Sequence, residues 1–313
     1  MKSRFLTAFV VGLLASMGTA TTLHGDIDSK TTRSITYITL GASFTYGVGA
    51  DGNVIGEDLY EPGSGGAYTS QVVDKLVRFA DVAHFNTAIP GQTSGQILAT
   101  QTEGALSFLA DNPADRTFVE VASGGNDLLG FLLFPRSLPP LLEPARDACY
   151  RTEPASNGRF EELYIFQDSP ICEGAISQII ANAQRNLTAL IDSFQAQLPA
   201  SAKFLVRNYP NPVLSTPAEF GGAPCLSLVE QPALYGVRLT EAVVNKYLDG
   251  ISSDGDFLGL NPMIAEVANE KGVTLVNIEG TLAGTNVFAD CVHPNQEGHD
   301  QIFKRVIKAI KSH

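Results

Sequence analysis

The sequence is poor in basic side chains and in several of the rarer residues. Its 313 residues include no tryptophan, three methionines and four cysteines, and 21 lysines and arginines stand against 33 aspartates and glutamates. The formal net charge of −12 opposes general attraction to nucleic-acid phosphates and to anionic membranes. We therefore expect no nucleic-acid partner.

Familiar metal-binding motifs are also missing. The chain has no CxxC and no HExxH, and Cys291 and His293 lie too close together for a usual pair of structural zinc ligands. We expect neither a metal nor a cofactor.

Only one long apolar run is present, and it lies near the N-terminus. The run FLTAFVVGLLASM follows Lys2 and Arg4, and the small residues Gly18 and Ala20 suit a signal-peptide cleavage site. It is too short to span a bilayer comfortably. We predict a signal peptide over residues 1–20, cleaved near Ala20, and a short segment over 21–33. The mature protein is expected to be secreted or periplasmic, monomeric and without stable membrane insertion.

The four cysteines all lie in the mature part of the chain. An even number in an exported protein favours two disulfides. Sequence alone allows three pairings. Only one of them leaves the two bridges neither nested nor crossed, and it joins Cys149 to Cys172 and Cys225 to Cys291.

Beyond residue 33 the chain alternates strand-like and helix-like segments. Two longer amphipathic segments, at about 176–198 and 302–310, have apolar residues at helical spacing. Strands separated by helices require crossovers, which predicts a parallel sheet covered on both faces. We expect one three-layer α/β domain over residues 34–313. The five short runs rich in Val, Ile, Phe and Thr are 34–40, 82–88, 116–122, 202–209 and 273–279.

Two segments interrupt this alternation and are interpreted as insertions. They cover about 130–172 and 210–225 and are rich in proline or glycine. Their apolar residues, including 131–134 and 138–142, could line a substrate pocket or simply pack over the sheet edge.

Four of the predicted strands are followed by polar or glycine-rich residues. Ligands of open parallel sheets bind at the carboxyl ends of the strands, so these segments are expected to meet. Each has an ordinary alternative: a turn at Ser43 and at Gly91, a helix cap at Asn126, a surface ion pair between Asp290 and His293. His299 also has an ordinary explanation, as a packed or capping residue of the last helix. The set following the strands is Ser43, Gly91, Asn126, Asp290 and His293.

Together these residues suit nucleophilic catalysis. A serine hydroxyl needs a base, His293 can serve as one, and Asp290 can orient that imidazole. The backbone N–H groups of Ser43 and Gly91 and the amide of Asn126 would stabilise an oxyanion.

The same segments resemble the four sequence blocks of the GDSL or SGNH hydrolases. The blocks are GASFTYG, the stretch from Asn86 to Gly91, GGND and DCVHPN, in the family's order and spacing from about residue 35 to the C-terminus. The resemblance implies a flavodoxin-like three-layer α/β/α sandwich with a central, mainly parallel five-stranded sheet. It implies hydrolysis of esters, thioesters or lipids through an acyl-enzyme. One departure is Ala42, where the family's name-giving motif has aspartate, and another is Phe44, where leucine is common.

We therefore predict an exported serine esterase or lipase that acts on small-molecule or lipid esters. Two alternatives remain open. One is a carbohydrate acetyl esterase of the same fold, which the lack of tryptophan for stacking on sugars disfavours. The other is a non-catalytic exported binding protein in which Ala42 marks a degenerate site.

Overall fold

A computed structural model describes most of the chain beyond residue 33. The described residues are 20–23, 33–51, 66–138, 142–155, 161–211, 219–220, 223–224, 236–251, 257–282 and 292–312. The strands are β1 (Ala20–Leu23), β2 (Ser34–Leu40), β3 (Asp81–Asn86), β4 (Arg116–Val121), β5 (Tyr150–Pro154), β6 (Glu162–Phe166), β7 (Lys203–Arg207), β8 (Glu219–Phe220), β9 (Ala223–Pro224), β10 (Val237–Arg238) and β11 (Thr274–Val276). The α-helices are α1 (Ser43–Tyr46), α2 (Tyr68–Leu76), α3 (Ser94–Thr100), α4 (Thr102–Asp111), α5 (Gly125–Leu133), α6 (Glu143–Cys149), α7 (Pro170–Gln195), α9 (Glu241–Val244), α10 (Leu260–Glu270) and α11 (Gln296–Lys311), with a 3-10 turn η1 (Pro135–Ser137) and a π-helical turn η3 (Asn245–Asp249).

The central sheet has the order β1-β3-β2-β4-β7-β11. Its last five strands are mutually parallel, and in chain order they read 2-1-3-4-5, which is the flavodoxin-like arrangement. The predicted five-stranded parallel sheet is therefore confirmed. Strand β1 lies before the predicted domain and pairs antiparallel with the outer edge of β3. An edge strand leaves backbone N–H and C=O groups free, and β1 occupies those of β3.

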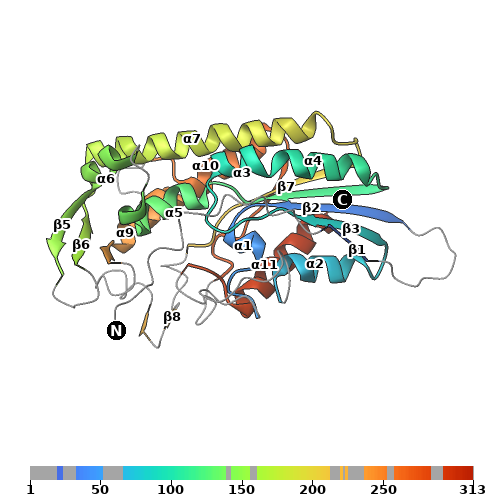
Figure 1. Cartoon of the computed structure of the whole chain (residues 1–313), viewed down its shortest axis with the longest axis horizontal. Helices are drawn as coiled ribbons and strands as arrows, with labels where there is room; N and C mark the ends of the chain where they lie inside the picture. The colour runs from blue at the N-terminus through green and yellow to red at the C-terminus, as the bar shows by residue number, and fades with distance from the viewer. Residues whose placement is uncertain are drawn as a thin grey trace.

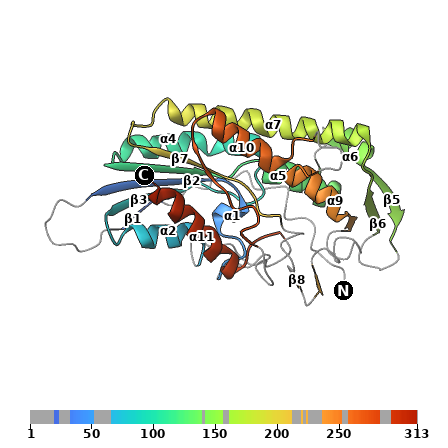
Figure 2. The same ribbon diagram turned by 180° about the vertical axis from the view of Figure 1, so that it is seen from behind.

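Helices cover both faces of this sheet, as Figure 1 and the reverse view in Figure 2 show. Helices α2 and α11 lie on one face, and α3, α4, α5, α7 and α10 lie on the other. Side chains alternate along each strand, so in β2 Tyr37 belongs to the core under α2 and α11, while Ile38 and Leu40 belong to the opposite core. None of the helices in the described part of the chain has the length and apolarity needed to cross a bilayer.

The two long helices predicted from the sequence are present and begin at side-chain caps. Ser169 accepts a hydrogen bond from the backbone N–H of Cys172 at the start of α7, and Asn295 accepts one from Gly298 at the start of α11. Proline at the first position of α7 also suits a helix start.

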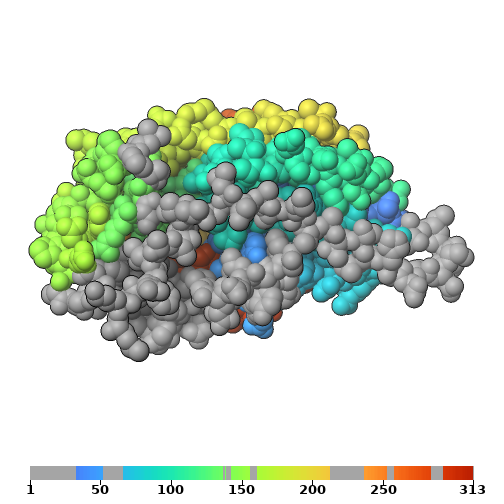
Figure 3. Space-filling model, in the orientation of Figure 1, coloured from blue at the N-terminus to red at the C-terminus, as the bar shows by residue number. Residues whose placement is uncertain are grey.

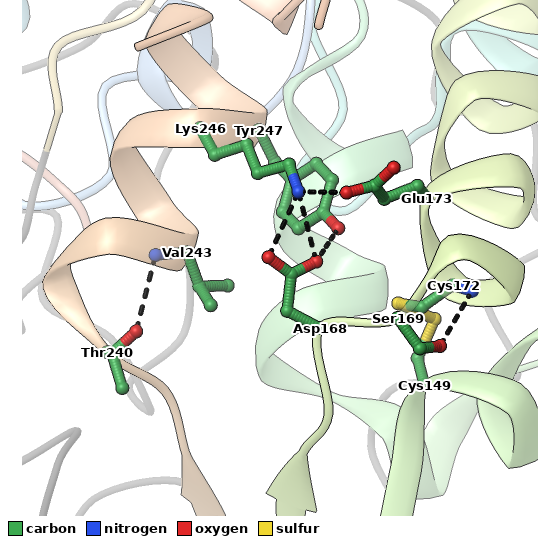
Figure 4. Close-up of polar contacts among 9 residues, drawn as sticks. All are labelled: Cys149, Asp168, Ser169, Cys172, Glu173, Thr240, Val243, Lys246 and Tyr247. Atoms are coloured by element: carbon green, nitrogen blue, oxygen red, sulfur yellow. Dashed lines mark hydrogen bonds and ion pairs between the residues drawn. A yellow bond between two sulfur atoms is a disulfide. The ribbon is translucent and has the colours of Figure 1, made fainter. Parts of the chain in front are cut away.

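The insertion at 130–172 is largely ordered secondary structure. It contains the end of α5, α6 and the antiparallel pair β5 and β6, and a disulfide joins Cys149 to Cys172. Figure 4 shows this bridge beside a cluster in which Lys246 lies between the carboxylates of Asp168 and Glu173. Cys225 and Cys291 lie outside the described residues, so the second predicted pairing stays a prediction.

The first three residues of the apolar run at 131–134 pack in the core. Phe131, Leu132 and Leu133 belong to α5 and are buried in the core beneath α7. Phe134 ends the helix and is 40% exposed. The packing interpretation therefore holds for residues 131–133.

Candidate active site

Ser43, the predicted nucleophile, lies where strand β2 turns into helix α1. It is the first residue of this four-residue helix, so its backbone N–H is not used by the helical ladder. The helix closes through a 2.9 Å bond from the Tyr46 N–H to the Ala42 carbonyl, and Gly47 ends it in the left-handed conformation. The Ser43 side chain is largely covered, with 8% of the residue exposed. Residues 41–46 are called the serine turn below.

The loop after β3 packs directly against the serine turn. The Asn86 side chain donates to the Thr45 carbonyl at 3.0 Å and accepts from the Ala88 N–H at 3.0 Å, which ties the loop to α1. Gly91 has φ 82°, a left-handed conformation that side chains with a Cβ rarely adopt. The backbone conformation at position 91 therefore favours glycine. The predicted oxyanion role of Gly91 remains a prediction.

Asn126 follows β4, and its side chain contacts the loop after β3. It is the second residue of α5, and its side-chain amide donates to the Gln92 carbonyl at 2.9 Å. An amide has two donor hydrogens, so one remains for a ligand. The next residue, Asp127, accepts from both the N–H and the hydroxyl of Ser94 at 2.7 Å. Burial raises the pKa of Asp127, and the Ser94 hydrogen bonds act to lower it.

His293 reaches this region from the segment before α11. Its ring meets the Phe44 ring edge-on with centroids 5.7 Å apart, so the imidazole lies against the residue that follows Ser43. Asp290 lies outside the described residues, and its role in orienting His293 stays a prediction. The other candidate on α11, His299, is buried between the Tyr68 N–H and the Val48 carbonyl, as expected for a packed residue. Burial lowers the pKa of His299 to about 4.

A cleft joins these elements at the carboxyl edge of the sheet. Ser43, Asn126 and Val292 all line it. Strands β2 and β4 end level, with Leu40 opposite Val121, and the chain order reverses between them. Ligands of such sheets bind at this switch point. Figure 3 shows the blue segment at the place of α1 reaching the surface near the middle of the view. The apolar part of the lining consists of Ala42, Phe44, Ala122, Leu129 and Val292.

Two lining residues at the end of β7 were not predicted from the sequence. Arg207 is fully buried, pairs with Glu120 at 3.4 Å and donates to the Thr45 hydroxyl at 3.2 Å. Burial acts to lower its pKa, but Tyr68 and Glu120 outweigh it and the pKa is raised. The sequence held a signal for Arg207, because an arginine that ends a buried strand needs a buried partner.

Tyr209 is the second missed residue. Its ring lies 6.0 Å from that of Phe44, and its side chain packs against Gly125. A Cβ on Gly125 would come within 2.5 Å of the Tyr209 ring, so only glycine fits there. Burial raises the pKa of Tyr209 to about 12, which keeps the phenol neutral.

The arrangement defines an α/β protein with a cleft at the switch point of a flavodoxin-like sheet. A model of the GDSL-like lipase/acylhydrolase family matches residues 39–301, and the chain therefore belongs to this family. No curated protein sequence matches the chain significantly. In the described residues no three histidines, cysteines or acidic residues gather as a metal site would require.

Two solved structures with the same fold are lipases. The chain is similar to the lipase Lip_vut3 from a goat rumen metagenome, with 16% identity, a TM-score of 0.52, and coverage of 88% of this chain and 97% of that one. It is also similar to an extracellular lipase from Streptomyces rimosus, with 19% identity, a TM-score of 0.51, and coverage of 88% and 99%. At this level of identity the likeness concerns the fold.

Proposed function

We propose that the protein is an exported serine hydrolase that cleaves carboxylic esters through an acyl-enzyme on Ser43. The observation that carries this proposal is the shared cleft. Ser43, Asn126 and the segment with His293 come from three distant parts of the chain and border one space at the switch point of the sheet.

In the proposed reaction the Ser43 hydroxyl attacks the ester carbonyl while His293 takes its proton. The tetrahedral oxyanion accepts from the free N–H of Ser43, from Gly91 and from the second amide hydrogen of Asn126. The leaving alcohol then takes the proton from His293. Water, activated by the same imidazole, releases the acid and regenerates Ser43. Asp290 orients His293 in this scheme.

The lining favours an apolar acyl group. Phe44, Leu129 and Val292 present hydrocarbon beside Ser43, whereas the apolar run at 131–133 is used in the core. The substrate class we propose is therefore a small-molecule or lipid ester whose acyl chain lies on these three side chains. Export follows from the signal peptide expected at residues 1–20.

A fluorophosphonate probe tests the chemistry. The purified protein should be labelled at Ser43, and a Ser43→Ala variant should not be. Losing one oxyanion donor typically lowers kcat by ~10²–10³, so Asn126→Ala should be labelled far more slowly than the parent. Absence of labelling in folded wild-type protein would instead support a non-catalytic binding protein.

p-Nitrophenyl esters of increasing chain length then test the substrate class. We expect turnover to extend beyond acetate, and enlarging the lining side chain with Leu129→Phe should shorten the preferred chain. Turnover of acetate alone would refute the acyl-chain proposal and favour an acetyl esterase.

A further inference from the structure

The serine turn is held by a side chain from a distant helix junction. Gln101 lies between α3 and α4 and is 2% exposed. Its amide oxygen accepts from the Gly41 N–H at 2.9 Å, and its amide nitrogen donates to the Gly41 carbonyl at 2.7 Å. Both backbone groups of the glycine two residues before Ser43 are therefore bonded to one planar group.

The amide of Gln101 is also fully satisfied. Its oxygen accepts a second bond from the Thr87 hydroxyl at 3.1 Å, and its nitrogen donates a second to the Gln92 side-chain oxygen at 2.7 Å. An amide offers two donor hydrogens and two acceptor sites, and all four are used here. A reversed amide would place its oxygen against two acceptors, so the orientation is fixed.

This network continues to the predicted oxyanion donor. Gln92 accepts from Gln101 through its side chain and from Asn126 through its backbone carbonyl. The chain of bonds thus runs from Gly41 through Gln101 and Gln92 to Asn126. With the Thr87 bond to Gln101, it links the first three sequence blocks of the site.

The backbone of Gln101 is itself firmly held. Its N–H donates to the Ile97 carbonyl at 3.0 Å, and its carbonyl accepts from the Ala105 N–H at 3.1 Å, so it belongs to two helices. A rigid anchor of this kind can fix the group that it contacts. Ala42, which stands where the family motif has aspartate, brings no polar side chain to the turn.

We propose that Gln101 is a positioning residue that sets the distance and orientation of Ser43 relative to Asn126. This role rests on the proposed hydrolase function. Catalysis demands that the attacking oxygen and the oxyanion donors be aligned, and a displacement of about 1 Å can cost about 100-fold in rate. Loss of the brace should therefore lower kcat and leave ester binding, which uses the apolar lining, nearly unchanged.

The first test replaces the amide by an apolar side chain of similar length. Gln101→Met should lower kcat for a p-nitrophenyl ester about 10- to 100-fold, with KM within about twofold. The matched control is Gln96→Met on α3. The exposed side-chain oxygen of Gln96 accepts from the Thr93 N–H and does not touch the serine turn. The control should keep kcat within about twofold. Folding of each variant is checked by circular dichroism.

The second test uses a charge change that a merely structural role would not reproduce. In Gln101→Glu the protonated acid can still donate toward the Gly41 carbonyl, but the ionised form sets a negative oxygen against that carbonyl and Gln92. The ratio of variant to wild-type kcat should fall about tenfold as pH rises from about 5 to about 8. This variant keeps the shape of glutamine and serves if Gln101→Met does not fold.

Three results would overturn the proposal. One is a folded Gln101→Met protein with kcat within twofold of wild type, another is a ratio for Gln101→Glu that does not change with pH, and the third is an equal loss in the Gln96→Met control. A wild-type protein inactive toward both esters and probe would refute the hydrolase function itself, and the positioning role with it.

Discussion

Replacing Glu120 by glutamine should destabilise the protein severely, although the side chain keeps its shape. Glu120 and Arg207 are both fully buried, and the carboxylate accepts from the hydroxyls of Tyr37 at 2.6 Å and Tyr68 at 2.8 Å. The neutral amide would leave the Arg207 charge buried under α1 without a counter-charge. Removing one partner of such a pair costs about 3–5 kcal/mol. Since whole domains are stable by about 5–15 kcal/mol, the loss would be a large share.

Urea unfolding measures this cost directly. The transition is followed by far-UV circular dichroism, because the chain has no tryptophan for fluorescence. Glu103→Gln, an exposed glutamate on α4, is the matched control and should change stability by less than about 0.5 kcal/mol. The double variant Glu120→Gln with Arg207→Met should lose at least about 2 kcal/mol less than the sum of its single variants. A loss under about 1 kcal/mol for Glu120→Gln, or strict additivity, would refute the reasoning.

Two further predictions concern the surroundings of the cleft. The pKa of His299 is lowered by burial to about 4, against about 6.5 in an unfolded chain, so stability should fall by up to about 3 kcal/mol as pH drops through this window. His299→Gln should flatten that part of a stability profile measured by urea unfolding, and an unchanged slope would contradict the assignment. Gly125→Ala should displace the Tyr209 ring, cost about 1–3 kcal/mol and slow fluorophosphonate labelling. Gly130→Ala on the same helix has nothing within 4 Å of the new methyl, and equal effects of the two changes would count against a steric cause.

The arrangement of the sheet could be predicted because its signals are local. Strand β2 matches its predicted range of 34–40. An alternating or continuous apolar run of a few residues is enough to predict a buried strand. Strand β1 could not be predicted in this way, because its pairing depends on the free edge of β3 rather than on its own composition.

The candidate site, like the sheet, could be predicted only in part. The order of the residues shows that Ser43, Gly91 and Asn126 follow consecutive strands, and the rule for parallel sheets then predicts that they lie at one edge. The side chains that hold this edge together became visible in the folded chain alone. Gln101 is 60 residues from Gly41, and Arg207 is 162 residues from Thr45. The partner in neither contact can be identified from a local pattern in the chain, because a hydrogen bond between distant residues exists only once the sheet and its helices have brought them together.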